Sequence, residues 1–351
     1  MTIRLAVVDD SRFVREALSR VMADEPDITL VGTAETGEDL LARLDEWRPD
    51  VITLDLAMPG MGGLATLDRI MAVRPTPVII LSSKAGEGAP LTLEALSRGA
   101  ADFIDKEAYR LVDFQALRAV LMAKIRSLSA PRPVETAAPP PVGAMTGAVP
   151  AVAAGRSRLA LIAIGASTGG PGAIEQILRT LGTRPTVPIA IVQHMPPGFT
   201  TAFAERLDRQ LPFPVREALD GAPLEIGAVH IAPAGLHLRA DRRTDGVAAR
   251  LDPHPTAVAH RPSVDVLFSS VAAAVGERSV AVLLTGMGRD GAEGMAALAR
   301  AGGLTIAQSA ATCIVYGMPR AAVELGAARE ILPLGTIGPR LGELMALNAA
   351  P

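Results

Sequence analysis

Short apolar runs alternate with amphipathic stretches along the first part of the chain. Five runs of strand length lie at residues 3–8, 28–32, 51–54, 77–81 and 101–104. The stretches between them, for example 12–22 and 113–128, carry apolar residues at helical spacing. Because strands that alternate with helices form parallel sheets covered on both faces, this part predicts an α/β domain with five strand–helix units.

The second half of the chain repeats this alternation. Apolar runs at 159–164, 187–193 and 279–284 are continuous, which is typical of strands buried on both faces. Helical patterns follow at 173–181, 264–275 and 292–300. We therefore expect a second α/β domain, doubly wound and mostly parallel.

A segment rich in proline and alanine separates the two patterns. It is nearly uncharged and shows neither the strand nor the helix period, so it cannot bury enough surface to fold. The sequence thus predicts a first domain at 1–128, a linker at 129–157 and a second domain at 158–351.

Composition and charge narrow the class of protein. The chain has 351 residues, enough for two cores, and its net charge of −3 gives no electrostatic footprint for nucleic acid. A single cysteine excludes a disulfide framework. No apolar stretch is long enough for a bilayer, and the N-terminus runs directly into a strand pattern. We expect a cytoplasmic monomer that does not insert into membranes.

Acidic side chains mark the strand ends of the first domain. Asp9 and Asp10 follow the first strand and Asp55 follows the third. Because parallel strands point the same way, the three carboxylates can converge, and so few oxygen ligands suit Mg²⁺. Ser82 and Lys106 follow the fourth and fifth strands at the same rim. Helix caps and turns are the alternative explanation for the aspartates, but they leave five polar groups at four strand ends unexplained.

A glycine-rich turn follows the first strand of the second domain and carries Ser167. The spacing Gly165-x-Ser167-x-Gly169 matches the nucleophile elbow of α/β-hydrolases, and it lacks the residues of a P-loop or a dinucleotide fingerprint. Ser167 could instead cap the next helix. Pro171 argues against that, since proline favours the first helical position and would make Gly170 the cap.

A histidine and an aspartate follow two other strands of this domain. His194 comes after the strand at 187–193, and Asp290 lies in a glycine-rich loop after the strand at 279–284. Serine needs an adjacent imidazole to take its proton, and a carboxylate orients that imidazole. Since no histidine follows Asp290, the order is Ser…His…Asp, unlike the α/β-hydrolases. The alternatives are a surface histidine and a capping box between Asp290 and Glu293.

The remaining histidines have simpler explanations. His230 is expected to pack inside a strand, while His237 and His254 are expected at the surface. His260 either contacts substrate or belongs to a cap before the helix at 264–275. No grouping in this half has metal-ligand spacing, so the second domain is expected to hold no cofactor.

The first domain resembles the receiver domain of two-component response regulators, which has a flavodoxin-like (βα)5 fold. The resemblance implies that Asp55 is the phosphoacceptor, Ser82 the switch hydroxyl and Lys106 the conserved lysine. It also implies that Asp9, Asp10, Asp55 and the carbonyl of Ala57 hold Mg²⁺. Gly62 and Glu107 stand where the family usually has aspartate and proline, and their effect on switching stays open.

The second domain resembles the catalytic domain of CheB-type chemotaxis response regulators, the protein-glutamate methylesterases. The runs that carry the likeness are IGASTGGP, VQHMP, HIAP, HRPSVDVLF, LLTGMGRDGAEGM and ATCIVYGMPRAA. The family's roles fall on Ser167 as nucleophile, His194 as general base and acid, Asp290 as orienting carboxylate and the N–H of Met287 in the oxyanion hole.

This resemblance implies a serine hydrolase that demethylates glutamate γ-methyl esters of chemoreceptors, deamidates receptor glutamines and is activated by phosphorylation. A histidine kinase would be the phosphodonor and methylated chemoreceptors the substrate. Three other classes stay open: a non-catalytic regulator, a DNA-binding response regulator and a general esterase. The sequence does not identify the receptor, the output of the pathway or the interface between the domains.

Overall fold

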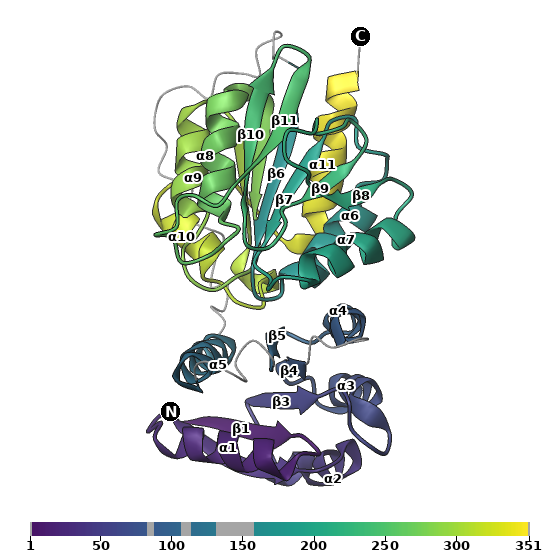
Figure 1. The fold of residues 1–351 in the computed structure, drawn as a ribbon, viewed down its shortest axis with the longest axis vertical. Coiled ribbons are helices and arrows are strands. Elements are labelled where there is room, and N and C mark those ends of the chain that lie inside the picture. The colour runs from purple at the N-terminus through teal and green to yellow at the C-terminus, as the bar shows by residue number, and fades with distance from the viewer. Residues whose placement is uncertain (1, 83–87, 107–113, 131–157, 350–351) are drawn as a thin grey trace. The chain divides into compact units, whose positions relative to one another are not determined.

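The computed structural model describes residues 2–82, 88–106, 114–130 and 158–349, and the chain divides into two compact units after Ala130 (Figure 1). Nearly all of the predicted linker at 129–157 lies outside the described residues. The two units are considered separately.

The first unit contains a parallel sheet of five strands in the order β2-β1-β3-β4-β5. This order and the helical connections confirm the flavodoxin-like fold. Four strands extend beyond their predicted ends: β2 continues to Ala34, and Asp55, Ser82 and Asp105 still belong to the ladders of β3, β4 and β5. The strands are β1 (Ile3–Val8), β2 (Ile28–Ala34), β3 (Val51–Asp55), β4 (Val78–Ser82) and β5 (Asp102–Asp105).

Five helices connect and cover these strands. Ser11 caps the first helix by accepting a hydrogen bond from the Val14 N–H, as expected for a serine at this position. Ion pairs of Arg118 and Arg126 with Glu25 tie the last helix to the turn after the first. The helices are α1 (Arg12–Ala23), α2 (Gly37–Trp47), α3 (Gly62–Val73), α4 (Gly88–Ser97) and α5 (Phe114–Ser129).

The second unit contains a parallel sheet of seven strands in the order β14-β13-β12-β6-β7-β9-β8. This confirms the predicted doubly wound α/β class and places β6 at the centre, paired with β12 on one side and β7 on the other. The strands are β6 (Leu161–Ala166), β7 (Ile189–Gln193), β8 (Val215–Glu217), β9 (Val229–Ile231), β12 (Ser279–Leu283), β13 (Leu304–Gln308) and β14 (Glu330–Leu332).

Helices lie on both faces of this sheet (Figure 1). One face carries α6, α7 and α11, and the other carries α8, α9 and α10 together with an antiparallel hairpin, β10 (His237–Arg243) and β11 (Gly246–Asp252). The helices are α6 (Gly170–Arg179), α7 (Phe199–Gln210), α8 (Val264–Ala274), α9 (Ala292–Arg300), α10 (Met318–Glu324) and α11 (Leu334–Ala349).

The core under α8 follows from the alternation of side chains along a strand. Leu161 and Ala163 of β6 lie in one fully buried cluster with Phe268 of α8 and Met295 of α9. The hairpin closes the same cluster with Leu238. Each large apolar side chain buried here contributes about 1.5–3 kcal/mol, so the loops at the strand ends rest on a rigid base.

Within the described ranges, no helix is both long and apolar enough to cross a membrane.

Candidate functional site

The three residues predicted to form a catalytic triad follow three neighbouring strands of the second unit, Asp290 in the loop after β12. Ser167 directly follows β6, and His194 directly follows β7. Their preceding residues, Ala166 and Gln193, are partners in the ladder, and the His194 N–H donates to the Ala166 carbonyl at 3.1 Å. On the other side of β6, the Ser167 N–H donates to the Thr285 carbonyl at 3.0 Å, in the loop that leads to Asp290.

His194 and Asp290 form a direct contact across 96 residues of sequence. Nε2 of His194 lies 2.8 Å from Oδ2 of Asp290. The side chains are only 8% and 13% exposed, so water screens the pair weakly. Nδ1 of His194 is buried and has no hydrogen-bond partner among the described residues. Among the described residues no hydrogen bond joins this nitrogen to Ser167, which directly follows the neighbouring strand β6.

Asp290 accepts three further hydrogen bonds from the start of α8. Ser263 Oγ–H donates to Oδ1 at 2.8 Å, the Val264 N–H to Oδ2 at 2.8 Å and the Asp265 N–H to Oδ1 at 3.0 Å. The carboxylate thus sits at a helix N-terminus, where N–H groups and the helix dipole favour negative charge.

The pKa of Asp290 lies well below its ordinary range. Burial alone would raise this pKa, but the hydrogen bond and charge of His194 together with the N–H donors of Asp265 and Val264 outweigh it. Asp290 is therefore ionised at neutral pH and can orient the imidazole.

The pKa of the neighbouring Asp265 is shifted in the opposite direction from that of Asp290. Burial and the neighbouring charge of Asp290 raise the pKa of Asp265 to about 6, although its Oδ1 accepts a hydrogen bond from the Gly294 N–H at 2.7 Å.

Two predicted caps are wrong in detail. The capping box between Asp290 and Glu293 does not form: Gly291 is the N-cap of α9, and Glu293 pairs with Arg289. Asp290 instead accepts hydrogen bonds from the first N–H groups of α8, a helix whose N-cap is Ser263. In α6 the N-cap is Gly169 rather than Gly170, since Gly169 adopts the left-handed conformation (φ 76°).

The backbone around Ser167 is closely surrounded. The Gln193 side-chain amide donates to the carbonyls of Ser167 (2.9 Å) and His194 (3.1 Å), which links the two strand ends. A side chain at Gly286 would place its Cβ 2.7 Å from Ser167 Cβ and 2.3 Å from Met318 Sδ. Glycine is required at that position because the two loops touch there.

Met287, the predicted oxyanion donor, follows Gly286 in this loop. The Gly286 carbonyl accepts hydrogen bonds from the N–H groups of Gly317 (3.1 Å) and Met318 (2.9 Å), which hold the loop next to Ser167. Among the described residues, the Met287 N–H has no acceptor. This N–H is thus free to bind a substrate oxygen.

The prediction of a surface His237 is wrong. His237 is 0% exposed, its Nδ1 accepts from the Ser263 N–H at 3.1 Å, and its Nε2 lies 3.0 Å from the Pro255 carbonyl. Its burial lowers its pKa. His230 is buried in β9 and His254 is exposed, as predicted. Sequence analysis did not identify Ser263 as a partner of Asp290, because their hydrogen bond depends on the packing of α8.

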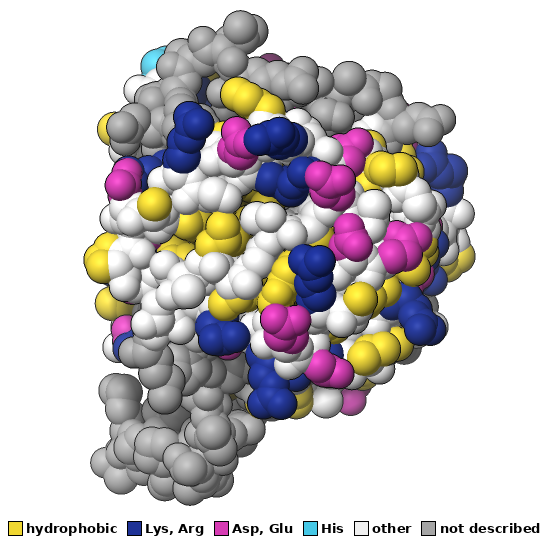
Figure 2. All heavy atoms as spheres, turned by 90° about the horizontal axis from the view of Figure 1, so that it is seen from below, with side chains coloured by type: hydrophobic (Ala, Val, Ile, Leu, Met, Phe, Trp, Pro, Cys, Tyr) yellow, Lys and Arg dark blue, Asp and Glu magenta, His cyan; other side chains and the backbone are white. Residues whose placement is uncertain are grey.

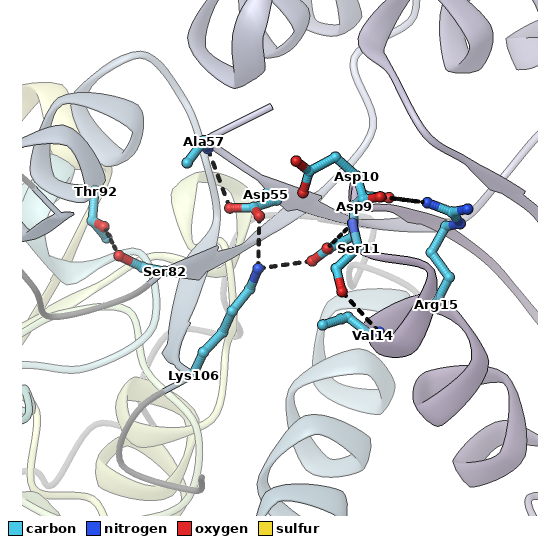
Figure 3. A network of polar contacts seen from close by, with 10 residues as sticks. All are labelled: Asp9, Asp10, Ser11, Val14, Arg15, Asp55, Ala57, Ser82, Thr92 and Lys106. Atoms are coloured by element: carbon cyan, nitrogen blue, oxygen red, sulfur yellow. Dashed lines mark hydrogen bonds and ion pairs between the residues drawn. The ribbon is translucent and has the colours of Figure 1, made fainter. Parts of the chain in front are cut away.

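In the first unit, the predicted acid pocket forms at the ends of β1, β3 and β5 (Figure 3). Carboxylate oxygens of Asp9, Asp10 and Asp55 all lie within 4.8 Å of one another. Lys106 Nζ lies 2.7 Å from both Asp9 Oδ2 and Asp55 Oδ2, and Glu107 lies outside the described ranges.

The pocket fits a divalent cation. Burial, together with the charge of Asp55, raises the pKa of Asp9, although Lys106 acts against this shift. One lysine cannot neutralise three converging carboxylates, and hard oxygen donors are the ligands that Mg²⁺ prefers. The residues present therefore suit this ion.

The remaining predicted receiver residues lie around the pocket. Ser82 ends β4, and its hydroxyl lies beside Thr92, which donates a hydrogen bond to it (Figure 3). The Ala57 N–H donates to Asp55 Oδ1 at 3.2 Å. Gly62 starts α3 with φ 73°, and a side chain there would meet nothing within 4 Å.

Figure 2 shows one face of the molecule, on which Lys and Arg side chains are interspersed with Asp and Glu. This face lacks the continuous basic surface that nucleic-acid binding requires.

Comparison with known families decides the assignment. Residues 162–341 match the CheB methylesterase family, and residues 5–118 match the response regulator receiver domain. The chain belongs to the CheB methylesterase family. It combines the family's catalytic domain with a receiver domain, which confirms the predicted fold and enzyme class.

Full-length relatives share this organisation. The chain is 47% identical over 346 residues to the protein-glutamate methylesterase/protein-glutamine glutaminase of Symbiobacterium thermophilum, covering 95% of each chain. It is 41% identical to the enzyme of the same name from Geobacillus kaustophilus, covering 98% of this chain and 99% of the relative. The second unit is similar to the crystal structure of the Thermotoga maritima CheB methylesterase catalytic domain. The TM-score is 0.52 and the identity 39%, with 54% of this chain and 100% of that chain covered.

Proposed function

We propose that this CheB methylesterase hydrolyses glutamate γ-methyl esters of chemoreceptors, and deamidates receptor glutamines, through Ser167, His194 and Asp290. The observation that carries this proposal is the contact between His194 Nε2 and Asp290 Oδ2 at 2.8 Å, with the buried Nδ1 unpartnered among the described residues. An ionised carboxylate on one ring nitrogen makes the other a base for a serine at the adjacent strand end.

The reaction proceeds in two steps. His194 Nδ1 accepts the Ser167 hydroxyl proton as Oγ attacks the γ-carbonyl carbon, and the Met287 N–H binds the oxyanion. The C–O bond to the methoxy group then breaks, and His194 returns the proton to release methanol. In the second step water attacks the acyl-enzyme, with His194 again as base and then acid. The products are a free carboxylate and the restored serine.

Asp290 stabilises the imidazolium that forms in both steps. Its low pKa keeps it ionised, and its bonds to the start of α8 fix its position. The proton therefore stays on His194 until the leaving group or Ser167 takes it.

The receiver unit is the proposed control element. Asp55 would accept a phosphoryl group from a chemotaxis histidine kinase, and Mg²⁺, held by Asp9, Asp10, Asp55 and the Ala57 carbonyl, would neutralise the charge of that group. Lys106 already reaches Asp55 at 2.7 Å, and Ser82 lies on the neighbouring strand as the switch hydroxyl. We expect the unphosphorylated receiver to obstruct the catalytic site.

The test is methanol release from methylated receptor membranes by Ser167→Ala. The variant loses the nucleophile, so hydrolysis is expected to fall by at least about 10⁴-fold. Phosphorylation of Asp55 by a small phosphodonor is expected to be unchanged. Ser269→Ala, at an exposed position of α8, is the matched control and should keep full activity. Turnover by Ser167→Ala close to that of the control would refute the assignment.

A further inference from the structure

A second imidazole lies on the ring of the proposed general base. The rings of His194 and His260 are stacked, with centroids 4.1 Å apart and an interplanar angle of 20°. The separation and near-parallel planes are those of a packed aromatic pair. Sequence analysis left His260 between a substrate contact and a helix cap, and neither explains a ring stacked on His194.

The backbone that carries His260 is anchored immediately after it. The Arg261 carbonyl accepts from the Gly235 N–H at 3.1 Å, and Ser263 binds both His237 Nδ1 and Asp290 Oδ1. Because Ser263 is 1% exposed and His237 is 0% exposed, these anchors are rigid. His260 is thus held by the same segment that holds the carboxylate of Asp290.

Without the ring of His260, the hydrogen bond to Asp290 alone would hold the imidazole ring of His194. Asp290 fixes one atom of the imidazole, Nε2, and leaves the ring free to rotate about the line through that hydrogen bond. Nδ1 has no partner among the described residues, so no hydrogen bond opposes that rotation before substrate binds. A flat ring packed against one face restricts the rotation.

We propose that His260 is a positioning residue, whose stacked ring holds His194 in the orientation in which Nε2 contacts Asp290 and Nδ1 is available to Ser167. This inference rests on the proposed function of His194. His260 acts on the proton transfer in both steps and needs no contact with the substrate. It should therefore affect kcat and leave KM unchanged.

The experiment compares His260→Phe, which keeps a flat ring, with His260→Ala, which removes it, in the full-length chain. Methanol release from methylated receptor membranes gives kcat and KM. Inactivation by a small serine-directed organophosphate measures the reactivity of Ser167 without receptor binding. His260→Leu, which keeps bulk without a flat ring, serves if the alanine variant does not fold. His254→Ala, at an exposed histidine of the same unit, is the control.

The proposal predicts that His260→Ala lowers kcat and the inactivation rate about tenfold, while KM stays within twofold. A tenfold change in rate corresponds to about 1.4 kcal/mol. His260→Phe should restore most of the loss, and His260→Leu should not. Unchanged kcat in His260→Ala, an effect on KM alone, or a phenylalanine variant as slow as the alanine variant would each overturn it.

Ser167→Ala, measured in parallel, separates this inference from the assignment of the triad. If Ser167→Ala is inactive and His260→Ala is as fast as the control, only the role of His260 fails. If Ser167→Ala remains active, the assignment of the triad is refuted, and the role proposed for His260 is refuted with it.

Discussion

At the residue scale, the carboxylate of Asp290 connects the start of α8 to His194. Its two oxygens accept from Ser263, Val264 and Asp265 and also contact His194. The hydrogen bond and charge of His194, together with the N–H donors of α8, lower the pKa of this carboxyl group and keep it ionised. A residue whose sequence context fits the cap of its own helix thus binds the first N–H groups of another helix and contacts His194.

Asp265 lies close to this carboxylate and gives a prediction about pH. The folded-state pKa of Asp265 is raised to about 6, above the value of 3.8 for an ordinary aspartate. Its contribution to stability is therefore present below about pH 4 and is lost as the pH rises through about 6. Asp265→Asn imitates the protonated form and does not ionise. The variant is expected to gain stability relative to the wild type between pH 5 and pH 7, on the order of 1 kcal/mol after allowance for partial exposure.

Urea unfolding followed by circular dichroism at the two pH values measures this difference. The single tryptophan, Trp47, is in the first unit, so its fluorescence reports on that unit and serves as the internal control. A stability difference that does not change between pH 5 and pH 7, or one seen also in the Trp47 signal, would contradict the account.

At the scale of elements, the loop after β12 depends on a glycine. Gly286→Ala would place a methyl group 2.7 Å from Ser167 Cβ and 2.3 Å from Met318 Sδ. The flexible methionine side chain can move aside, but the contacts with Cβ and N of Ser167 are relieved only if the backbone of Ser167 shifts. We expect kcat to fall at least about a hundredfold, since displacement of a reacting group by about 1 Å has this effect. Overpacking should also cost about 1–3 kcal/mol of stability.

Gly335→Ala in α11 is the matched substitution, because a Cβ there would meet only Gln176 Nε2 at 3.8 Å. It should leave activity unchanged and not lower stability, since alanine favours helix. Activity of Gly286→Ala within a few-fold of this control would show that the loop does not need to approach Ser167 closely.

Most strands and helices that carry functional residues could be predicted from the sequence. Continuous apolar runs predicted β6, β7 and β12, and the loops after these strands carry Ser167, His194 and Asp290. The hairpin β10–β11 was not predicted, because two consecutive arginines, Arg242 and Arg243, are typical of a solvated turn. In the structure β10 continues to Arg243. The burial of His237 was not predicted for a different reason. It depends on the packing of the hairpin against α8, which no local sequence pattern encodes.

At the scale of the whole molecule, strand order could not be read from the sequence, yet it brings the site together. β6 lies between β12 and β7, so Ser167, His194 and the loop that carries Asp290 follow neighbouring strands, although His194 and Asp290 are 96 positions apart in the sequence. Apolar runs alone do not state which strands are neighbours. The resemblance to a known family implies the three roles, and the topology places the residues that would perform them after neighbouring strands.

The proposed control of the catalytic unit by the receiver unit leads to a testable prediction. If the unphosphorylated receiver obstructs the site, a fragment starting at residue 158 should hydrolyse methylated receptor faster than the unphosphorylated full-length chain. Asp55→Asn in the full chain should remove stimulation by a phosphodonor and leave basal activity unchanged. Methanol release with and without phosphodonor measures both effects. A fragment no faster than the full chain would mean that the receiver acts by another route than obstruction.

The central claim, that Ser167 and His194 act as one hydrolytic unit, is tested most directly by a kinetic double-mutant cycle. Methanol release is measured for Ser167→Ala, His194→Gln and the double variant. If His194 acts only by activating Ser167, either change alone removes the whole mechanism, and the double variant should be no slower than the slower single variant. Losses that multiply in the double variant would show that the two residues act independently and would contradict the account.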